Sequence, residues 1–224
     1  MTPQDGFAYR FDWGVDGLLA LAPAAAVLVL VDVLRFSTAV SVAVERGVSV
    51  VPGPWEGSAR PWTLSARWIR EHPGGSRLEL TSANGALLAE TAVRAGARVV
   101  LTACFRNASA VATAAARLAA GGPIAVVAAG EEGRPAVEDL LGAGAVLAAL
   151  DPSAAVSAPA CSPDAAAARA AFVAARPRLA DVLAGCDSAR ELEARAFGDD
   201  VTDAAALDVS TAVPVLRDGA FVSL

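Results

Sequence analysis

The chain has 224 residues, which suits one α/β domain, and 55% of them are hydrophobic, giving a mean hydropathy of +0.48. Its net charge of −6 and its lack of a basic stripe argue against nucleic acid as a partner. All 18 basic residues are arginine, which excludes a lysine Schiff base and the phosphate-binding lysine of a P-loop. The three cysteines show no metal-binding spacing, and their odd number suits the reducing cytoplasm.

The longest apolar run covers residues 18–33, but Pro23 interrupts it and Asp32 lies at its end. A transmembrane helix needs roughly 20 apolar residues without such breaks, and no basic segment precedes the run. We therefore expect neither a membrane span nor a signal peptide. The run instead predicts a loop followed by a strand over residues 27–31, which is buried on both faces because it is apolar throughout.

Helices and strands alternate along the rest of the first 150 residues. A helix is expected over 37–46, where Gly47 stops it, and a short strand over 49–51. Residues 52–75 are irregular, with a helix expected over 62–71. Three strand–loop–helix units follow, with strands over 78–80, 99–101 and 124–127 and helices over 86–95, 108–120 and 135–150.

Units of this kind need crossover connections and therefore a mostly parallel sheet. We predict a single domain over residues 1–224, folded as a three-layer α/β/α sandwich with a mostly parallel, mixed sheet. After residue 151, a surface connection should lead into helices over 165–183 and 189–197. Residues 213–216 and 220–222 predict a hairpin at an edge of the sheet.

The most informative polar segment begins where the strand over 27–31 ends. Ligands of open α/β sheets bind outside the carboxyl ends of the strands, where Asp32 could hold a metal, act as a nucleophile or simply bind a loop. Arg35 could clasp a phosphate with its planar guanidinium or form an ordinary ion pair. Ser37 and Thr38 could contact a substrate or only cap the following helix.

Later loops add further candidates. Asn84 and Asn107 are the only asparagines, and each follows a predicted strand, where it could contact a ligand or adopt left-handed backbone geometry. Glu138 and Asp139 open a predicted helix, where acidic side chains complement the helix dipole or, beside Asp32, would complete an oxygen-rich magnesium site.

Two candidate nucleophilic mechanisms find little support. Cys104 lacks the arginine six residues later that a cysteine phosphatase needs, so we interpret it as structural. A Ser-His-Asp triad would depend on the single histidine, His72, which lies in a predicted turn. Acid–base chemistry is therefore expected from Asp and Glu side chains, or from a metal-bound water.

Several segments form an ordered set of motifs from about Trp13 to residue 224. They are VDVLRFSTAV (31–40), TSANG (81–85), RNASAVA (106–112), AG (129–130) with VEDLLGAG (137–144), DDV (199–201), LD (207–208) and VPV (213–215). Taken together, these segments resemble the 2-phosphosulfolactate phosphatase family. The resemblance implies an α/β/α fold and magnesium-dependent hydrolysis of 2-phospho-3-sulfolactate to 3-sulfolactate and phosphate, a step towards coenzyme M.

The family motifs, together with the strand-end positions, define the predicted site. Asp32, Arg35, Asn84, Asn107, Glu138 and Asp139 occupy motif positions of the family. We predict Asp32 and Arg35 as catalytic, Ser37, Thr38, Ser82, Asn84, Gly85 and Asn107 as substrate-binding, and Asp32, Glu138 and Asp139 as ligands of Mg²⁺.

One departure from the family leaves two hypotheses. Family members typically carry Gly-Glu-Arg and Gly-Asn-Ser-Pro segments before the strand over 78–80, and residues 53–76 contain neither. The chain is either a Mg²⁺-dependent phosphomonoester hydrolase or a small-anion-binding protein of the same fold that has lost turnover. The expected partner is a small phosphorylated or sulfonated organic acid, not nucleic acid or a membrane, and the sequence is compatible with a homo-oligomer.

Overall fold

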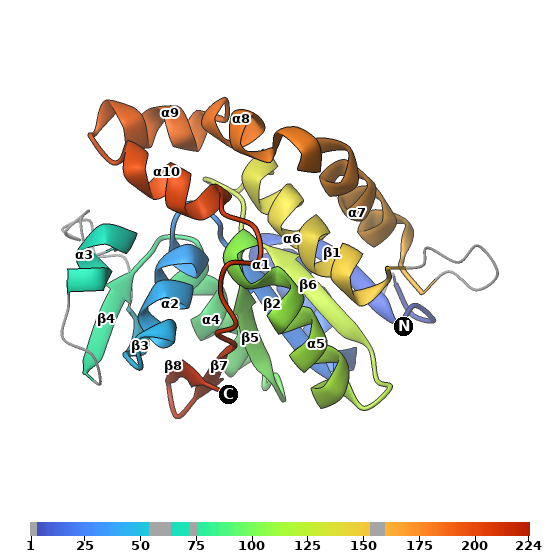
Figure 1. Ribbon diagram of the computed structural model, residues 1–224. Coiled ribbons are helices and arrows are strands. Elements are labelled where there is room, and N and C mark those ends of the chain that lie inside the picture. The colour runs from blue at the N-terminus through green and yellow to red at the C-terminus, as the bar shows by residue number, and fades with distance from the viewer. Residues whose placement is uncertain (1–3, 54–63, 72–75, 153–159) are drawn as a thin grey trace.

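The computed structural model describes residues 4–53, 64–71, 76–152 and 160–224. They form one eight-stranded mixed sheet between two layers of helices, which is the predicted three-layer sandwich (Figure 1). The sheet order is β1-β6-β2-β5-β7-β8-β3-β4. The strands are β1 (Tyr9–Trp13), β2 (Val27–Val31), β3 (Ser49–Gly53), β4 (Arg77–Thr81), β5 (Val100–Ala103), β6 (Ile124–Ala128), β7 (Pro214–Arg217) and β8 (Ala220–Ser223). The helices are α1 (Gly14–Leu21), α2 (Phe36–Glu45), α3 (Ala66–Glu71), α4 (Gly85–Arg94), α5 (Ala108–Ala119), α6 (Val137–Leu150), α7 (Pro163–Ala175), α8 (Leu179–Ala184), α9 (Asp187–Ala194) and α10 (Gly198–Ala205).

The continuous apolar strands lie at the centre of the parallel part of the sheet. Every residue of β2 and β6 is buried, as their sequences predict. Because successive side chains alternate between the faces of a strand, Val27 and Val29 enter the core beneath α5 and α6. Leu28 and Leu30 enter the opposite core, beneath α1 and α4.

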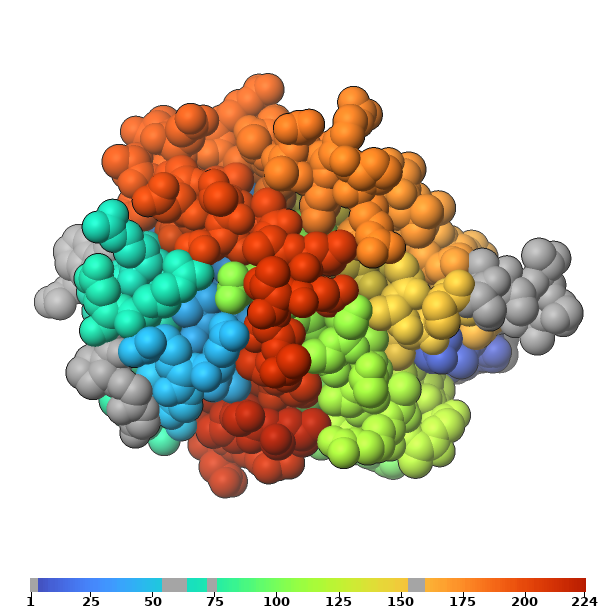
Figure 2. All heavy atoms as spheres, viewed as in Figure 1, coloured from blue at the N-terminus to red at the C-terminus, as the bar shows by residue number. Residues whose placement is uncertain are grey.

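The C-terminal hairpin corrects the predicted edge position. β7 and β8 lie inside the sheet, between β5 and β3, and both of their outer pairings are antiparallel. Leu101 pairs with Val215, and Val50 pairs with Phe221. The hairpin thus joins the parallel block β1-β6-β2-β5 to the parallel pair β3-β4. Figure 2 shows this C-terminal segment, in red, between the blue and green parts of the chain.

Residues 9–21 also differ from the prediction. The loop expected over the start of the apolar run is the second half of α1, and it is preceded by β1, which pairs in parallel with β6. Arg10 and Asp12 alternate with the aromatic residues of this strand, a pattern that favours a strand, although none was predicted here. The buried Arg10 side chain is satisfied locally, since its Nε donates to the Phe7 carbonyl at 3.0 Å and its Nη1 lies 3.5 Å from Asp5.

The C-terminal helices form a cap over one end of the sheet. The single helix expected over 165–183 is divided into α7 and α8 by a 3-10 turn at Arg176–Arg178, which contains Pro177. Figure 1 shows α8, α9 and α10 lying across one end of the sheet, the end at which α2 starts. Residues 62 and 63, His72 and most of the connection expected after 151 lie outside the described residues. None of the helices in the described ranges has both the length and the apolar character needed to span a bilayer.

Candidate active site

The carboxylate of Asp32 is held by main-chain donors from two helices. Its Oδ1 accepts the N–H of Phe36 at 3.1 Å, and its Oδ2 accepts the N–H of Gly85 at 2.8 Å. Ser82 Oγ lies 3.3 Å from the same Oδ2. The end of β2 and the start of α4 therefore meet at this one side chain, as expected for loops at the carboxyl ends of strands.

Ser37 and Thr38 stabilise the loop that carries Asp32. Ser37 Oγ accepts the Asp32 N–H at 2.9 Å and forms a 2.7 Å hydrogen bond with the Thr102 hydroxyl on β5. Thr38 Oγ1 donates to the Val33 carbonyl at 2.8 Å. Both side chains are buried, so their observed contacts support the loop, and neither lines the cleft described next.

A cleft of about 400 Å³ opens above this loop, between the strand ends and the helical cap. Asp32, Arg35, Ser82 and Asn84 line it as predicted, and the Asn84 amide donates to Glu131 Oε2 at 2.8 Å. The cap contributes residues that the sequence analysis did not select. The remaining lining residues are Leu34, Leu64, Thr81, Ala83, Glu131, Glu132, Ser188, Glu191, Leu192 and Arg195.

Arg35 enters the cleft from the Asp32 loop and is oriented by the cap. Its Nη1 donates to Asp200 Oδ2 at 2.8 Å, and its guanidinium carbon lies 4.5 Å from the centre of the Phe197 ring. Only 9% of the Arg35 side chain and 3% of the Asp200 side chain are exposed. The ion pair that the sequence left as an alternative is therefore present, at a position that also faces the cleft.

Comparison with known proteins decides the family. The family model described as 2-phosphosulpholactate phosphatase matches residues 65–219. A protein of Methanothermobacter thermautotrophicus named 2-phosphosulfolactate phosphatase is 30% identical over 210 residues, which cover 85% of this chain and 87% of that protein. This chain belongs to the 2-phosphosulfolactate phosphatase family. The family bears the name of a phosphoric monoester hydrolase, which agrees with the resemblance seen in the motifs.

Asp139 ties two loops of this phosphatase-family site together. Its Oδ1 accepts the Val33 N–H at 2.7 Å, and its Oδ2 accepts the Gly130 N–H at 2.9 Å. The neighbouring Glu138 lines a second hollow, which shares Glu131 and three other residues with the main cleft. Among the described residues, no group of three or more His, Cys, Asp or Glu side chains is arranged as a metal site.

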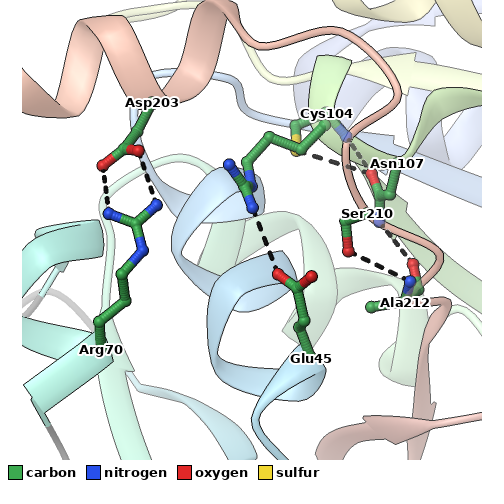
Figure 3. Close-up of polar contacts among 8 residues, drawn as sticks. Glu45, Arg70, Cys104, Asn107, Asp203, Ser210 and Ala212 are labelled. Atoms are coloured by element: carbon green, nitrogen blue, oxygen red, sulfur yellow. Dashed lines mark hydrogen bonds and ion pairs between the residues drawn. The ribbon is translucent and has the colours of Figure 1, made fainter.

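Asn107 lies away from the cleft, and its hydrogen bonds hold two segments of the chain together. Its Oδ1 accepts the Cys104 N–H at 3.0 Å, and its amide donates to the Ala212 carbonyl at 3.0 Å, as Figure 3 shows. It thereby ties the loop after β5 to the segment that leads into β7. Cys104 is fully buried, and this burial raises the pKa of its thiol, which suits the structural role predicted for it.

Gly85 is also placed behind the cleft surface. Its N–H binds Asp32, and a Cβ at this position would lie 2.5 Å from the Phe36 ring and 2.6 Å from Asp32 Oδ2. The motif therefore needs glycine here because α4 approaches the Asp32 loop too closely for any side chain.

Carboxylates of the site raise one another's pKa. Burial is the largest cause of the raised pKa of Asp32, and the nearby charge of Glu138 adds to it. The pKa of Asp139 lies well above its usual range because of burial and the charge of Asp32. Burial and the same Asp32 charge raise the pKa of Glu131. The ionised site is thus short of positive charge.

These raised pKa values predict how stability depends on pH. Between the ordinary carboxyl pKa of about 4 and the raised native values, the folded state binds more protons than the unfolded state, so stability falls as pH rises. Urea unfolding in a chelator should show this fall from pH 4 upwards. The slope should be smaller in Asp139→Asn, which removes one of the raised groups. A free energy of unfolding that increases over this range would contradict the assigned electrostatics.

Proposed function

We propose that the chain hydrolyses a small phosphorylated organic acid, 2-phospho-3-sulfolactate or a close analogue, to the free alcohol and inorganic phosphate. The observation that carries this proposal is the convergence of Asp32, Arg35 and Asn84 on one cleft in a member of this family. Free thiols at all three cysteines support the cytoplasm as the place of action.

Arg35 is the candidate ligand for the phosphoryl oxygens. A guanidinium offers donors in a fixed plane that matches phosphate geometry, and the low exposure of Arg35 strengthens such a contact. Asp32 is the candidate base for the attacking water, since a carboxylate with a raised pKa accepts a proton more readily at neutral pH. The water's oxygen then bonds to phosphorus while its proton passes to Asp32. The bond between phosphorus and the ester oxygen breaks, and that oxygen takes up a proton from solvent to leave as the free hydroxyl.

Mg²⁺ is proposed as the cofactor because the cleft lining carries four carboxylates and only two arginines. An anionic ester entering this cleft needs more positive charge than the arginines supply. Asp32 and Glu131, which both line the cleft, would hold the ion, because Mg²⁺ prefers oxygen ligands and needs only one or two carboxylates besides water. Glu138 lines the neighbouring hollow instead. Asp139 is a weaker candidate, since it lines neither the cleft nor the neighbouring hollow. The bound ion would polarise the phosphoryl group and lower the pKa of a coordinated water.

Phosphate release from a panel of phosphomonoesters, with Mg²⁺ or with a chelator, tests this proposal. We expect release from 2-phospho-3-sulfolactate with Mg²⁺ and almost none in the chelator, because the carboxylates would then repel the ester. Melting curves with each ester provide the second measurement. An ester that raises the melting temperature without being hydrolysed would favour the anion-binding alternative, which the absent Gly-Glu-Arg and Gly-Asn-Ser-Pro segments suggest. An equal rate in the chelator would contradict the metal requirement.

A further inference from the structure

Helix α10 reaches from the cap to the arginine of the cleft. Asp200, in its first turn, is 2% exposed and uses both carboxylate oxygens. Oδ2 receives the Arg35 guanidinium at 2.8 Å, and Oδ1 accepts the Ser65 hydroxyl at 2.9 Å and the Ala66 N–H at 3.0 Å. The carboxylate is therefore fixed by the start of α3 before it meets Arg35.

This arrangement fixes the plane of the guanidinium as well as its position. Phe197, just before α10, lies beneath the guanidinium of Arg35, while Asp200 holds one edge of it. Without the carboxylate and the ring, the long arginine side chain would sample several rotamers across the cleft.

We propose that Asp200 is a positioning residue that orients Arg35 toward the substrate phosphoryl group. The inference rests on the proposed function, because it assigns Asp200 a role through the arginine of that same site. Asp200 does not itself line the cleft, so its role is exerted through Arg35.

Asp203 provides a matched control on the same helix. Its two oxygens accept Arg70 Nη1 and Nη2 at 2.7 and 2.6 Å, so this pair also fastens α10 to α3 (Figure 3). The Arg70–Asp203 pair is more exposed and does not touch Arg35. Asp203→Asn should therefore weaken the same attachment of the helix while leaving the cleft arginine in place.

Steady-state kinetics of Asp200→Asn, Phe197→Leu and Asp203→Asn test the inference. A misoriented arginine predicts a kcat about ten- to a hundredfold lower in Asp200→Asn, since small displacements of a binding group can cost that much. Phe197→Leu should show a smaller loss of kcat, and Asp203→Asn none. In an Arg35→Lys background, Asp200→Asn should have no further effect on kcat, because the two residues act as one unit.

Three results would overturn the positioning role. The first is a kcat of Asp200→Asn equal to that of folded Asp203→Asn. The second is a lower KM of Asp200→Asn with unchanged kcat, which indicates only a general charge effect. The third is a loss of kcat on Asp200→Asn that is just as large in the Arg35→Lys background. If Asp200→Asn does not fold, the kcat of Phe197→Leu is compared with that of Asp203→Asn in the same way.

If wild type releases no phosphate, the proposed function fails, and melting curves with inorganic phosphate decide the inference separately. A phosphate-induced shift changed in Asp200→Asn but not in Asp203→Asn supports it, and equal shifts refute it.

Discussion

Replacing Asp32 with asparagine should lower kcat by about 10²- to 10⁴-fold, which is the usual contribution of a general base. The side chain keeps its shape but loses the ability to accept a proton from water. Asparagine also presents an N–H₂ group to one of the main-chain donors now bound by the carboxylate. Phosphate release at saturating Mg²⁺ and ester is the measurement.

Asp208→Asn is the matched control for this substitution. Asp208 also accepts a main-chain N–H and a serine hydroxyl, both from Ser109, but it lies on the surface and outside the cleft. Its asparagine variant should retain wild-type kcat. An Asp32→Asn protein that melts cooperatively and turns over at the wild-type rate would remove Asp32 from the chemistry.

Gly85→Ala should cause the largest loss of stability, about 1–3 kcal/mol, as expected when a rigid and buried contact is overpacked. The added methyl group would collide with the Phe36 ring and with Asp32 Oδ2, so α4 must move away from β2. The same movement should remove the N–H from Asp32 and reduce turnover. Urea unfolding with a shared m-value gives the change in stability.

Gly198→Ala separates this contact from the general effect of replacing glycine. Gly198 is also the first residue of a helix, α10, but a Cβ there would meet only Glu193 Cγ at 3.9 Å. Removing the flexibility of glycine from the unfolded chain should leave this variant unchanged or more stable by about 0.4–1 kcal/mol. Equal losses in the two variants would show that the close approach at Gly85 is not the cause.

Local sequence patterns predicted the strands whose two faces are buried. β2 and β6 are continuous apolar runs, and a run of this kind has few other stable environments in a soluble fold. β1 was missed although Tyr9, Phe11 and Trp13 alternate with Arg10 and Asp12, a pattern that favours a strand. The hairpin was recognised, but its place inside the sheet depends on single pairings such as Val50 with Phe221, between residues far apart in the chain.

The candidate site was likewise predicted where local sequence position decides it, and missed where distant segments decide it. Asp32, Ser82 and Asn84 were predicted because each follows a strand, and the carboxyl ends of strands share one edge. Asn107 has the same sequence position but binds Ala212 instead, because the segment leading into β7 passes beside it. Ser188, Glu191 and Arg195 line the cleft from α9 and the residue that follows it, yet their spacing is that of any solvent-facing helix.

The hairpin inside the sheet has a consequence for how the chain is made. During synthesis, β3 and β4 emerge early, and β5 follows, but the residues that bridge these two blocks emerge only after all six of the other strands. Until then, β5 and β3 each present an unpaired edge, which is a known route to unwanted strand pairing. The helices can form as they leave the ribosome, whereas closure of the sheet must wait for contacts between residues far apart in the chain. The sheet is therefore completed in one late step, in which β7 and β8 join the six strands that precede them.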